Sequence, residues 1–400
     1  MELKSVMVLL LRALVVCTIL IVSNAGPALS FGEVSNVTES FGSRRELLSK
    51  TQPKFQNKLS GCGTGNPIAD CWQCDPNWAQ HRQELASCAI GFGQNAGGGR
   101  NGAIYVVTDP GDDNPTNPAP GTIRYAAIQP DPLWIIFEND MTITLKEELI
   151  VTSYKTFDGR GANVHIAYGA CFTLQFISNV IIHGLHIHDC KSTGPARVAS
   201  STTHVGQRGV TDGDGINIFG SSDLWIDQNY LSNCADGLVD VIQGSNSVTI
   251  SNNYFTNHNK VMLLGAHDTD YEDKNMQVTV AFNYFGPGLT QRLPRGRLGY
   301  FHVVNNYYSG WGIYAIGGSA NPTINSEGNH FDASGSPKEV TKDLDNTGNW
   351  RSVGDLFVNG AYFAQDGDVS SASIYNRATS FSPILASQVA AATAGAGPTS

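Results

Sequence analysis

Short apolar runs recur along the middle of the chain, at residues 179–187, 223–231, 247–255, 277–285, 301–308 and 323–331. Equivalent asparagines fall 23 to 30 residues apart, at Asn229, Asn253, Asn283, Asn306 and Asn329. A period in the twenties, with a short strand, a turn and another short strand, is typical of a parallel β-solenoid. The pattern therefore predicts an all-β chain coiled into a parallel β-helix.

The repeated asparagines are expected to be structural. Asparagine tolerates the left-handed backbone conformation that a tight turn between strands requires. When asparagines stack on successive coils, each amide can donate to one neighbour and accept from the other. We therefore assign these residues to the scaffold rather than to chemistry.

The N-terminus has the layout of a secretory signal peptide over residues 1–25. Lys4 precedes an apolar run over 6–22, and small residues follow at 23–25. A signal anchor is the alternative, but a 17-residue run interrupted by Arg12 is short for a membrane span of about 20 residues. No second apolar run of that length follows, so we predict secretion without membrane attachment.

The rest of the chain reads as one long domain with flexible ends. Residues 26–61 are polar and carry the single glycosylation sequon, at Asn36. Residues 62–380 hold the repeats, and within them only residues 75–88 show a clear helical cap and period. Residues 381–400 are rich in Ala, Gly, Ser and Thr and are expected to be a tail. A monomer is expected.

Composition narrows the class further. Hydrophobic residues make up 41% and charged residues 15%, which allows a sizeable core and excludes wholesale disorder. The 43 glycines exceed the 25 lysines and arginines, which favours a turn-dense β protein. A formal charge of −10 argues against nucleic-acid binding. A polyanionic partner would need a metal ion or a local basic patch.

Two acidic clusters lie one solenoid period apart. Asp212 and Asp214 flank a glycine, and Asp236 and Asp240 follow 24 residues after the first aspartate. Asp-Gly-Asp alone is usually a surface turn, but a second pair at the period of the coil would stack on the same side. Converging carboxylates repel unless a hard cation lies among them, and Ca²⁺ suits such oxygen ligands better than zinc. The ligand spacing of an EF-hand is absent.

A basic cluster follows the acidic ones. Arg292, Arg295 and Arg297 lie within six residues, and Lys260 lies one coil earlier. Such a group is usually a solvated patch. Beside a calcium site in an acidic protein, it instead indicates a surface that binds carboxylate groups, which arginine grips with two hydrogen bonds.

Seven segments of the chain resemble segments of the plant pectate lyases, and they occur in the same order along the sequence. They include Cys-Trp-Gln-Cys-Asp-Pro-Asn-Trp from residue 71, Asp-Gly-Leu-Val-Asp from 236 and Arg-Leu-Pro-Arg from 292, and the others are residues 88–93, 133–137, 157–161 and 180–185. The resemblance covers residues 62–363. It implies a right-handed parallel β-helix and calcium-dependent eliminative cleavage of pectate, a (1→4)-α-D-galacturonan.

The resemblance also implies residue roles. Arg292 matches the base that removes the C5 proton, and Lys260 and Arg297 match groups that hold uronate carboxylates. Calcium ligands are matched by Asp212, Asp236 and Asp240, with Asp214 matching a further one. Guanidinium ordinarily keeps its proton, so an arginine base predicts activity that leans alkaline.

Two positions depart from the family pattern beside this machinery. Gln228 stands where the family usually has histidine, and Ala266-His267 stands where it usually has His-Ser. Both departures could alter activity. His183, His186 and His188 are interpreted as structural side chains rather than metal ligands.

Removal of the signal peptide leaves seven cysteines, so at least one is free or bonded to another chain. Cys71 and Cys74 resemble half a zinc site, but no second pair at metal spacing follows. Spacing suggests disulfides Cys71–Cys88 and Cys171–Cys190, in agreement with the resemblance. Cys234 lies among residues expected to form a buried strand and is expected to be free, which leaves Cys62 and Cys74 as candidates for a third pair.

Two other functions remain open at this stage. One is a hydrolase on the same scaffold that cuts galacturonan with paired carboxylates. The other is a catalytically weak or inactive wall protein that binds pectate through calcium. The basic cluster at Arg292–Arg297 favours elimination over hydrolysis, whereas loss of turnover in Arg292→Lys would distinguish an enzyme from a binding protein.

Overall fold

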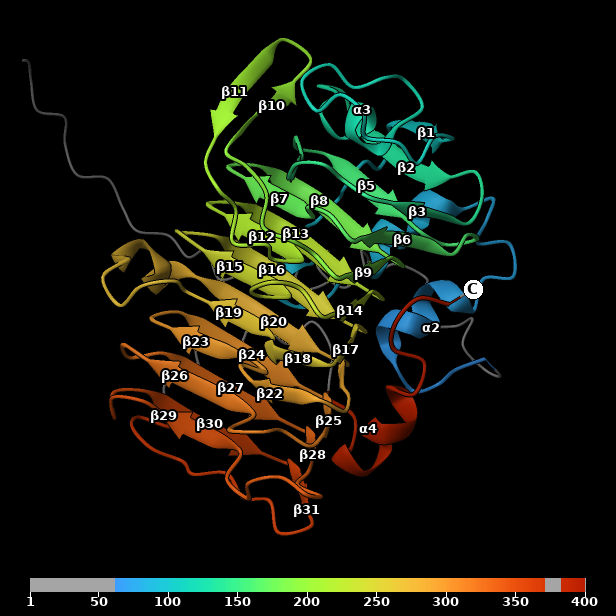
Figure 1. Cartoon of the computed structure of the whole chain (residues 1–400). Coiled ribbons are helices and arrows are strands. Elements are labelled where there is room, and N and C mark those ends of the chain that lie inside the picture. The colour runs from blue at the N-terminus through green and yellow to red at the C-terminus, as the bar shows by residue number, and fades with distance from the viewer. Residues whose placement is uncertain (1–61, 371–382, 400) are drawn as a thin grey trace, which may run out of the picture. The chain divides into compact units, whose positions relative to one another are not determined.

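The computed structural model describes residues 62–370 and 383–399. The dominant elements are short parallel strands stacked in long sheets (Figure 1). The expected signal peptide, the leader and the sequon at Asn36 lie outside the described residues.

Three large sheets contain most of the strands. The ten-stranded sheet has the order β1 (Ala103–Val107), β2 (Leu133–Phe137), β5 (Lys155–Asp158), β8 (Ser178–His183), β13 (Ser222–Asp227), β16 (Asn246–Ser251), β20 (Gln277–Ala281), β24 (Tyr300–Val304), β27 (Thr323–Glu327) and β30 (Asn349–Val353). The nine-stranded sheet has the order β3 (Met141–Ile143), β6 (Val164–Ala167), β9 (His186–His188), β14 (Tyr230–Ser232), β17 (Tyr254–Thr256), β21 (Tyr284–Phe285), β25 (Tyr307–Ser309), β28 (His330–Asp332) and β31 (Leu356–Val358). The eight-stranded sheet has the order β29 (Thr341–Asp343), β26 (Ile316–Ser319), β23 (Arg295–Arg297), β19 (Met262–Leu264), β15 (Val239–Ile242), β12 (Ile216–Phe219), β7 (Phe172–Gln175) and β4 (Leu149–Ile150).

Smaller elements decorate these sheets. Two further pairs are the antiparallel hairpin of β10 (Ala196–Ser201) and β11 (His204–Arg208) and the parallel pair of β18 (His258–Lys260) and β22 (Leu289–Gln291). The short helices are α2 (Pro67–Gln73), η2 (Arg82–Cys88), η3 (Gly91–Gly93), α3 (Ile123–Ala127), η4 (Tyr271–Asn275) and α4 (Ala386–Ala392).

From β4 to β31, each coil contributes one strand to each large sheet. Strands β12, β13 and β14 form one coil, and β15, β16 and β17 form the next, paired in parallel with the first. The strands are short because turn residues interrupt the chain at every corner. The right-handed parallel β-helix predicted from the repeat and the resemblance is confirmed.

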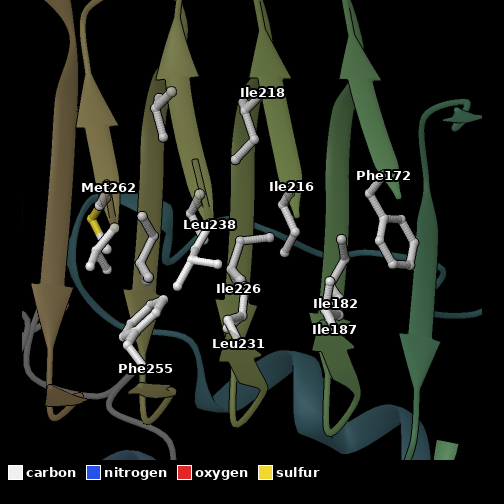
Figure 2. Packing of buried hydrophobic residues seen from close by; sticks show 14 of the residues in the cluster. Phe172, Ile182, Ile187, Ile216, Ile218, Ile226, Leu231, Leu238, Phe255 and Met262 are labelled. Atoms are coloured by element: carbon white, nitrogen blue, oxygen red, sulfur yellow. The ribbon is translucent and has the colours of Figure 1, made fainter. Parts of the chain in front are cut away.

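Inward-facing side chains stack from coil to coil and form the core (Figure 2). Ile182, Ile226 and Ile250 occupy one register row, and all three are fully buried. Rings stack in another row, with centroids 4.5 to 5.5 Å apart, in the order Phe255, Phe285, Tyr308, Phe331 and Phe357. Each fully buried large apolar side chain stabilises the fold by roughly 1.5–3 kcal/mol.

The asparagine ladder is present and lies inside the coil. The Oδ1 atom of Asn253 accepts hydrogen bonds from the backbone N–H and the Nδ2 of Asn229, at 2.9 and 3.1 Å. Its own Nδ2 donates to the carbonyl of Ile226 at 3.0 Å. We expected the ladder asparagines to adopt the left-handed backbone conformation, but the structure places it at the residue just before each of them. These residues are Gln228, Asn252, Phe282, Asn305 and Gly328. The side-chain amides of the ladder asparagines stabilise the turn through hydrogen bonds, whereas the preceding residue supplies the left-handed backbone conformation that the turn requires.

The helix predicted over 75–88 is only partly correct. Residues Arg82–Cys88 form the 3-10 helix η2, whereas Asp75 accepts a hydrogen bond from the backbone N–H of Asn77 at 2.9 Å. This local side-chain bond favours a turn over a helix. The α-helix α2 instead begins earlier, where Asn66 caps the backbone N–H groups of Ile68 and Ala69.

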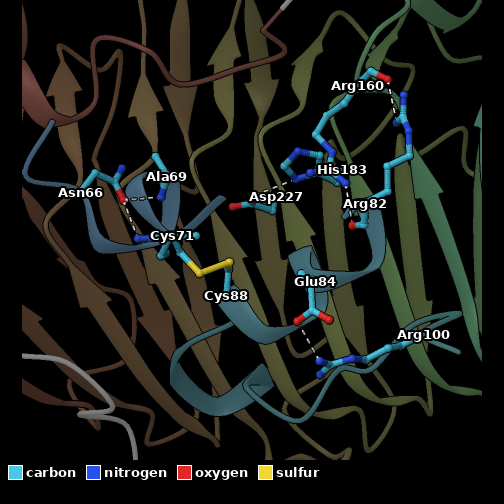
Figure 3. Close-up of a disulfide and its surroundings, with 11 residues drawn as sticks. Asn66, Ala69, Cys71, Arg82, Glu84, Cys88, Arg100, Arg160, His183 and Asp227 are labelled. Carbon is cyan, nitrogen blue, oxygen red and sulfur yellow. Dashed lines mark hydrogen bonds and ion pairs between the residues drawn. A yellow bond between two sulfur atoms is a disulfide. The ribbon is translucent and has the colours of Figure 1, made fainter. Parts of the chain in front are cut away.

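Three disulfides join six of the seven described cysteines, with Cys71–Cys88 shown in Figure 3. The others are Cys171–Cys190 and Cys62–Cys74. Cys71–Cys88 and Cys171–Cys190 are the pairs expected from spacing and resemblance, and Cys62–Cys74 is the pair that remained. Cys234 is free and buried, also as expected.

The C-terminal residues that the structure describes are not the tail that their composition predicts. Helix α4 lies within them, and its last residue accepts a hydrogen bond from Asn66 Nδ2 at 3.3 Å. Gln228 Nε2 donates to the carbonyls of Gly395 and Gly397 at 2.6 and 2.7 Å. Small residues allow this close approach. Gln228 therefore holds the C-terminal segment in place. The expectation that Gln228 adjoins the acidic and basic clusters is wrong.

No helix in the described part of the chain is long and apolar enough to cross a membrane.

The histidines have protein partners. His183 Nδ1 lies 2.9 Å from the buried Asp227 (Figure 3), and His188 Nδ1 lies 2.6 Å from Asp189. His165 stacks on His186, with ring centroids 4.4 Å apart. These contacts fit the structural interpretation.

Acid is expected to destabilise the fold through these rings. Burial, and then His165, lower the pKa of His186 to about 4, whereas histidine in an unfolded chain titrates near 6.5. Between these values the unfolded chain binds more protons, so the free energy of unfolding falls as pH falls. His186→Phe should weaken this dependence by roughly 1 kcal/mol between about pH 7 and pH 4.5, because partial exposure screens the effect. Urea unfolding at both pH values measures it.

His204→Gln, in the exposed hairpin, is the control and should leave the pH dependence unchanged. An unchanged dependence in His186→Phe would contradict the assignment.

Candidate active site

The acidic residues gather at the eight-stranded sheet, on two adjacent coils. Asp214 lies just before β12, and Asp240 lies in β15, where it pairs with Asn217 of β12. Asp214 accepts hydrogen bonds from Asn217 Nδ2 at 2.9 Å and from the backbone N–H of Gly237 at 2.7 Å. A Cβ at Gly237 would lie 2.3 Å from Asp240 Oδ1, so a glycine here admits the two carboxylates to one space.

The two acidic pairs are offset rather than in step. Ile216 pairs with Val239, 23 positions later, so the coil is one residue shorter here than the 24-residue spacing suggested. Asp212 is exposed, and Asp214 rather than Asp212 approaches Asp240. The expected stacking of Asp212 on Asp236 is therefore wrong in register, although all four aspartates belong to one electrostatic cluster.

This cluster is costly without a cation. Burial, and then the charge of Asp214, raise the pKa of Asp240 well above its ordinary value. Burial also raises the pKa of Asp214, and Asp236 and Asp212 add to the effect. Asp240 Oδ1 is buried with no hydrogen-bond partner. A buried carboxylate oxygen without a partner is unfavourable unless it is protonated or meets a cation.

These aspartates have the right ligand atoms for a hard divalent cation but do not form a complete coordination shell. Their donors are oxygens only, and one of them is an unpartnered buried carboxylate oxygen. Over the described residues, no group of three or more His, Cys, Asp or Glu side chains is drawn together closely enough to hold a metal ion unaided. The aspartates therefore supply part of a coordination shell that substrate oxygens or water would complete.

Lys260 faces this cluster from the next coil. It ends strand β18, and its Nζ lies 2.5 Å from Asp236 Oδ1. His258, at the other end of β18, lies with Nε2 2.6 Å from the carbonyl oxygen of Asp236. The loop that carries Asp236 is thus held from both ends of one strand.

Arg292 lies between β22 and β23, one coil beyond Lys260. Its backbone φ of 62° is in the left-handed region, and its carbonyl accepts a hydrogen bond from Met262 N–H at 2.8 Å. Its Nε atom is buried with no hydrogen-bond partner. Its charge opposes the rise in the pKa of Asp240. A guanidinium is thus held beside the acidic cluster with a donor to spare.

Two more arginines surround this position. Arg297 donates from Nε to Asp268 at 2.8 Å and from Nη1 to the carbonyl of Gly265 at 2.9 Å. Burial, and then the charge of Arg297, lower the pKa of Arg295, with Arg292 adding to the effect. Burial and the neighbouring guanidinium groups therefore disfavour the charged form of Arg295.

Sequence reasoning missed Asp268 and Tyr314. Asp268 fixes Arg297, yet it lies 29 residues earlier and no local motif links the two. Tyr314 is buried among the arginines, and burial raises its pKa while their charges oppose the rise. Ala266, which departs from the family pattern, directly follows the carbonyl that holds Arg297, so this departure does adjoin the basic group.

A pocket of about 300 Å³ adjoins the aspartates on the face of β7 and β12. Asp212 and Asp214 line one part of it, and Phe219 and Gln175 line another. The acidic cluster thus opens onto this pocket.

Known proteins with similar sequences are pectate lyases. The family model described as pectate lyase matches residues 142–397. Probable pectate lyase 20 of Arabidopsis thaliana is 61% identical over 345 residues, which cover 84% of this chain and 82% of that protein. A pectate lyase of Zinnia elegans is 60% identical over 84% of this chain and 86% of its own length.

Solved structures agree. The major cedar-pollen allergen Jun a 1 is 48% identical, with a TM-score of 0.81, over 84% of this chain and 100% of its own. A Bacillus subtilis pectate lyase, 17% identical with a TM-score of 0.51, covers 77% of this chain and 96% of its own and shares the fold alone. With a family model over more than half of its residues and relatives near 60% identity along most of its length, the chain belongs to the pectate lyase family.

Proposed function

We propose that this chain is a secreted, calcium-dependent pectate lyase that cleaves (1→4)-α-D-galacturonan by β-elimination. The observation that carries the proposal is the Arg292 guanidinium, whose buried Nε has no hydrogen-bond partner, beside the buried, charge-crowded Asp240. A hydrolase needs only paired carboxylates, whereas this arrangement adds a base and anion-binding groups. The N-terminal apolar segment and the disulfides support secretion, which oxidising compartments favour.

Calcium would be held by Asp214, Asp236 and Asp240, with Asp212 at the exposed edge. When bound, it would neutralise the uronate carboxylate and stabilise the charge that develops beside it. The carboxylates fit this role because burial and mutual repulsion disfavour their charged forms in the absence of a cation.

The chain's own residues would then carry the proton chemistry. Lys260 and Arg297 hold uronate carboxylates and fix the sugar. Arg292, in its neutral form, takes the proton from C5 of the uronate, the electrons of that bond form the C4=C5 double bond, and the C4–O bond breaks. The departing glycosidic oxygen takes a proton from water.

Removal of calcium should abolish this activity. With polygalacturonate as substrate, we expect the ultraviolet absorbance of unsaturated products to rise with calcium and to stop on addition of a chelator, with recovery when calcium is restored. Turnover that persists undiminished in excess chelator would contradict the calcium assignment. Reducing ends that appear without this absorbance would indicate hydrolysis.

A further inference from the structure

Three histidines gather on the outer face of the nine-stranded sheet, whereas the aspartates belong to the eight-stranded sheet. His165 lies in β6, and His186 and His188 lie in the neighbouring strand β9 (Figure 1). They alternate along their strands with Ile166 and Ile187, which are fully buried in the core. Successive side chains of a strand point to opposite faces, so the three imidazoles are directed outward.

One ring nitrogen of His188 is fixed by a carboxylate. His188 Nδ1 lies 2.6 Å from Asp189 Oδ2, and the other oxygen of this carboxylate accepts a hydrogen bond from Asn233 Nδ2. A carboxylate can only accept, so in the neutral ring Nδ1 carries the proton and Nε2 presents a lone pair. This contact is the one that commonly orients metal-binding histidines in proteins.

The lone pair of His188 faces a second imidazole. His188 Nε2 lies 2.9 Å from His165 Nδ1, and the two ring planes stand at 87°. Two imidazole nitrogens bound to one tetrahedral metal ion, each at about 2.0–2.1 Å, lie roughly 3.3 Å apart. The rings would therefore need to tilt and to part by a few tenths of an ångström, and His165 would carry its proton on Nε2.

The neighbouring rings are held in their neutral form, which metal binding requires. Burial, and then the charge of His188, lower the pKa of His165 below its ordinary value. His186 stacks on His165, with ring centroids 4.4 Å apart, and its own pKa falls to about 4. Lone pairs rather than bound protons are thus available near neutral pH, and Asp189 supplies a negative charge beside them.

A pocket of about 440 Å³ gives access to these nitrogens. It is lined by the three histidines and Asp189, with Tyr230 and Asn257 among its other walls. In the part of the chain that the structure describes, no third side chain of a metal-binding type joins the pair closely enough to complete a site. Water in the pocket would supply the remaining ligands. Imidazole nitrogen suits zinc, copper and nickel, whereas calcium prefers oxygen.

We propose that His165 Nδ1 and His188 Nε2 bind one divalent transition-metal ion of the zinc and copper class, with Asp189 orienting His188. For His188 this assignment replaces the structural interpretation. His183 keeps that interpretation, because its Nδ1 faces the buried Asp227. The site differs from the aspartate cluster in its sheet and in its ligand atoms, and it does not depend on the proposed function.

Titration with Zn²⁺ in a calorimeter tests the site, with excess Ca²⁺ present to compete for oxygen ligands. We expect the wild-type protein to bind Zn²⁺, and His188→Phe and His165→Phe each to weaken this binding roughly tenfold or more while they keep a ring in place. His81→Phe is the matched control. His81 Nδ1 lies 2.7 Å from Asp75, but His81 has no hydrogen bond to a second histidine among the described residues. Its replacement should leave the affinity within about twofold.

Copper adds a spectroscopic signature that a structural role would not produce. In electron paramagnetic resonance, Cu²⁺ bound to the wild-type protein should couple to two imidazole nitrogens, and Cu²⁺ bound to His165→Phe to one. If the wild-type protein binds no Zn²⁺, or if either phenylalanine variant of the pair keeps the wild-type affinity, the site is overturned and the 2.9 Å contact is a hydrogen bond between rings. Thermal unfolding without metal confirms that each variant is folded.

Discussion

Arg292→Lys is expected to lower kcat by roughly a thousandfold or more, with little change in the affinity for trigalacturonate. The substitution keeps a positive charge beside Asp240 but removes the guanidine that would take the C5 proton. General-base catalysis contributes about 10² to 10⁴ in rate, and misplacement of the shorter side chain adds to the loss. Initial rates of absorbance at saturating polygalacturonate and calcium measure kcat, and calorimetry measures affinity.

Arg100→Lys is the matched control. Arg100 is partly exposed and pairs with Glu84 at 3.2 Å near the N-terminal helices (Figure 3). This change should leave kcat within about twofold. If Arg292→Lys retains more than about a tenth of the wild-type kcat, the base lies elsewhere.

Asn253→Ala is expected to cost about 3–5 kcal/mol of unfolding free energy. The change removes the acceptor for two donors of Asn229 and the donor for the carbonyl of Ile226, all in the buried interior. Each buried polar group left without a partner costs about 1–3 kcal/mol. Urea unfolding followed by tryptophan fluorescence measures the loss.

Asn117→Ala, in an exposed loop, provides the comparison and should change stability by less than about 0.5 kcal/mol. A similarly small effect at Asn253 would mean that the ladder amides are replaceable, and that core packing alone holds the coils in register.

The fold could be predicted because its repeat is visible in the chain. A spacing of 23 to 30 residues between asparagines follows directly from coils that stack one strand on another. The ladder contacts confirm that these asparagines belong to the scaffold. The left-handed residue, however, lies one position earlier in each coil, because the ladder position requires the hydrogen bonds of the asparagine side chain and not a left-handed backbone. The prediction of a C-terminal tail from composition was wrong, because composition does not reveal contacts with residues distant in sequence, such as Asn66 and Gln228.

The sequence predicted which acidic residues would lie on adjacent coils, but it did not predict how they are arranged relative to one another. Sequence spacing brought Asp214 and Asp240 to adjacent coils, and the structure places them around Gly237. The one-residue offset in register depends on the length of a loop, which spacing between motifs does not reveal. Asp268 was missed because its link to Arg297 exists only in three dimensions.

The most direct measurement follows the substrate's own atoms. Octagalacturonate would be digested with calcium in water enriched in heavy oxygen, and the products analysed by mass spectrometry. Elimination predicts products with unsaturated ends, no heavy oxygen incorporated at cleavage and combined masses equal to that of the substrate. Incorporation of one heavy oxygen per cleavage would show hydrolysis, and intact substrate would show binding without catalysis; either result would contradict the account.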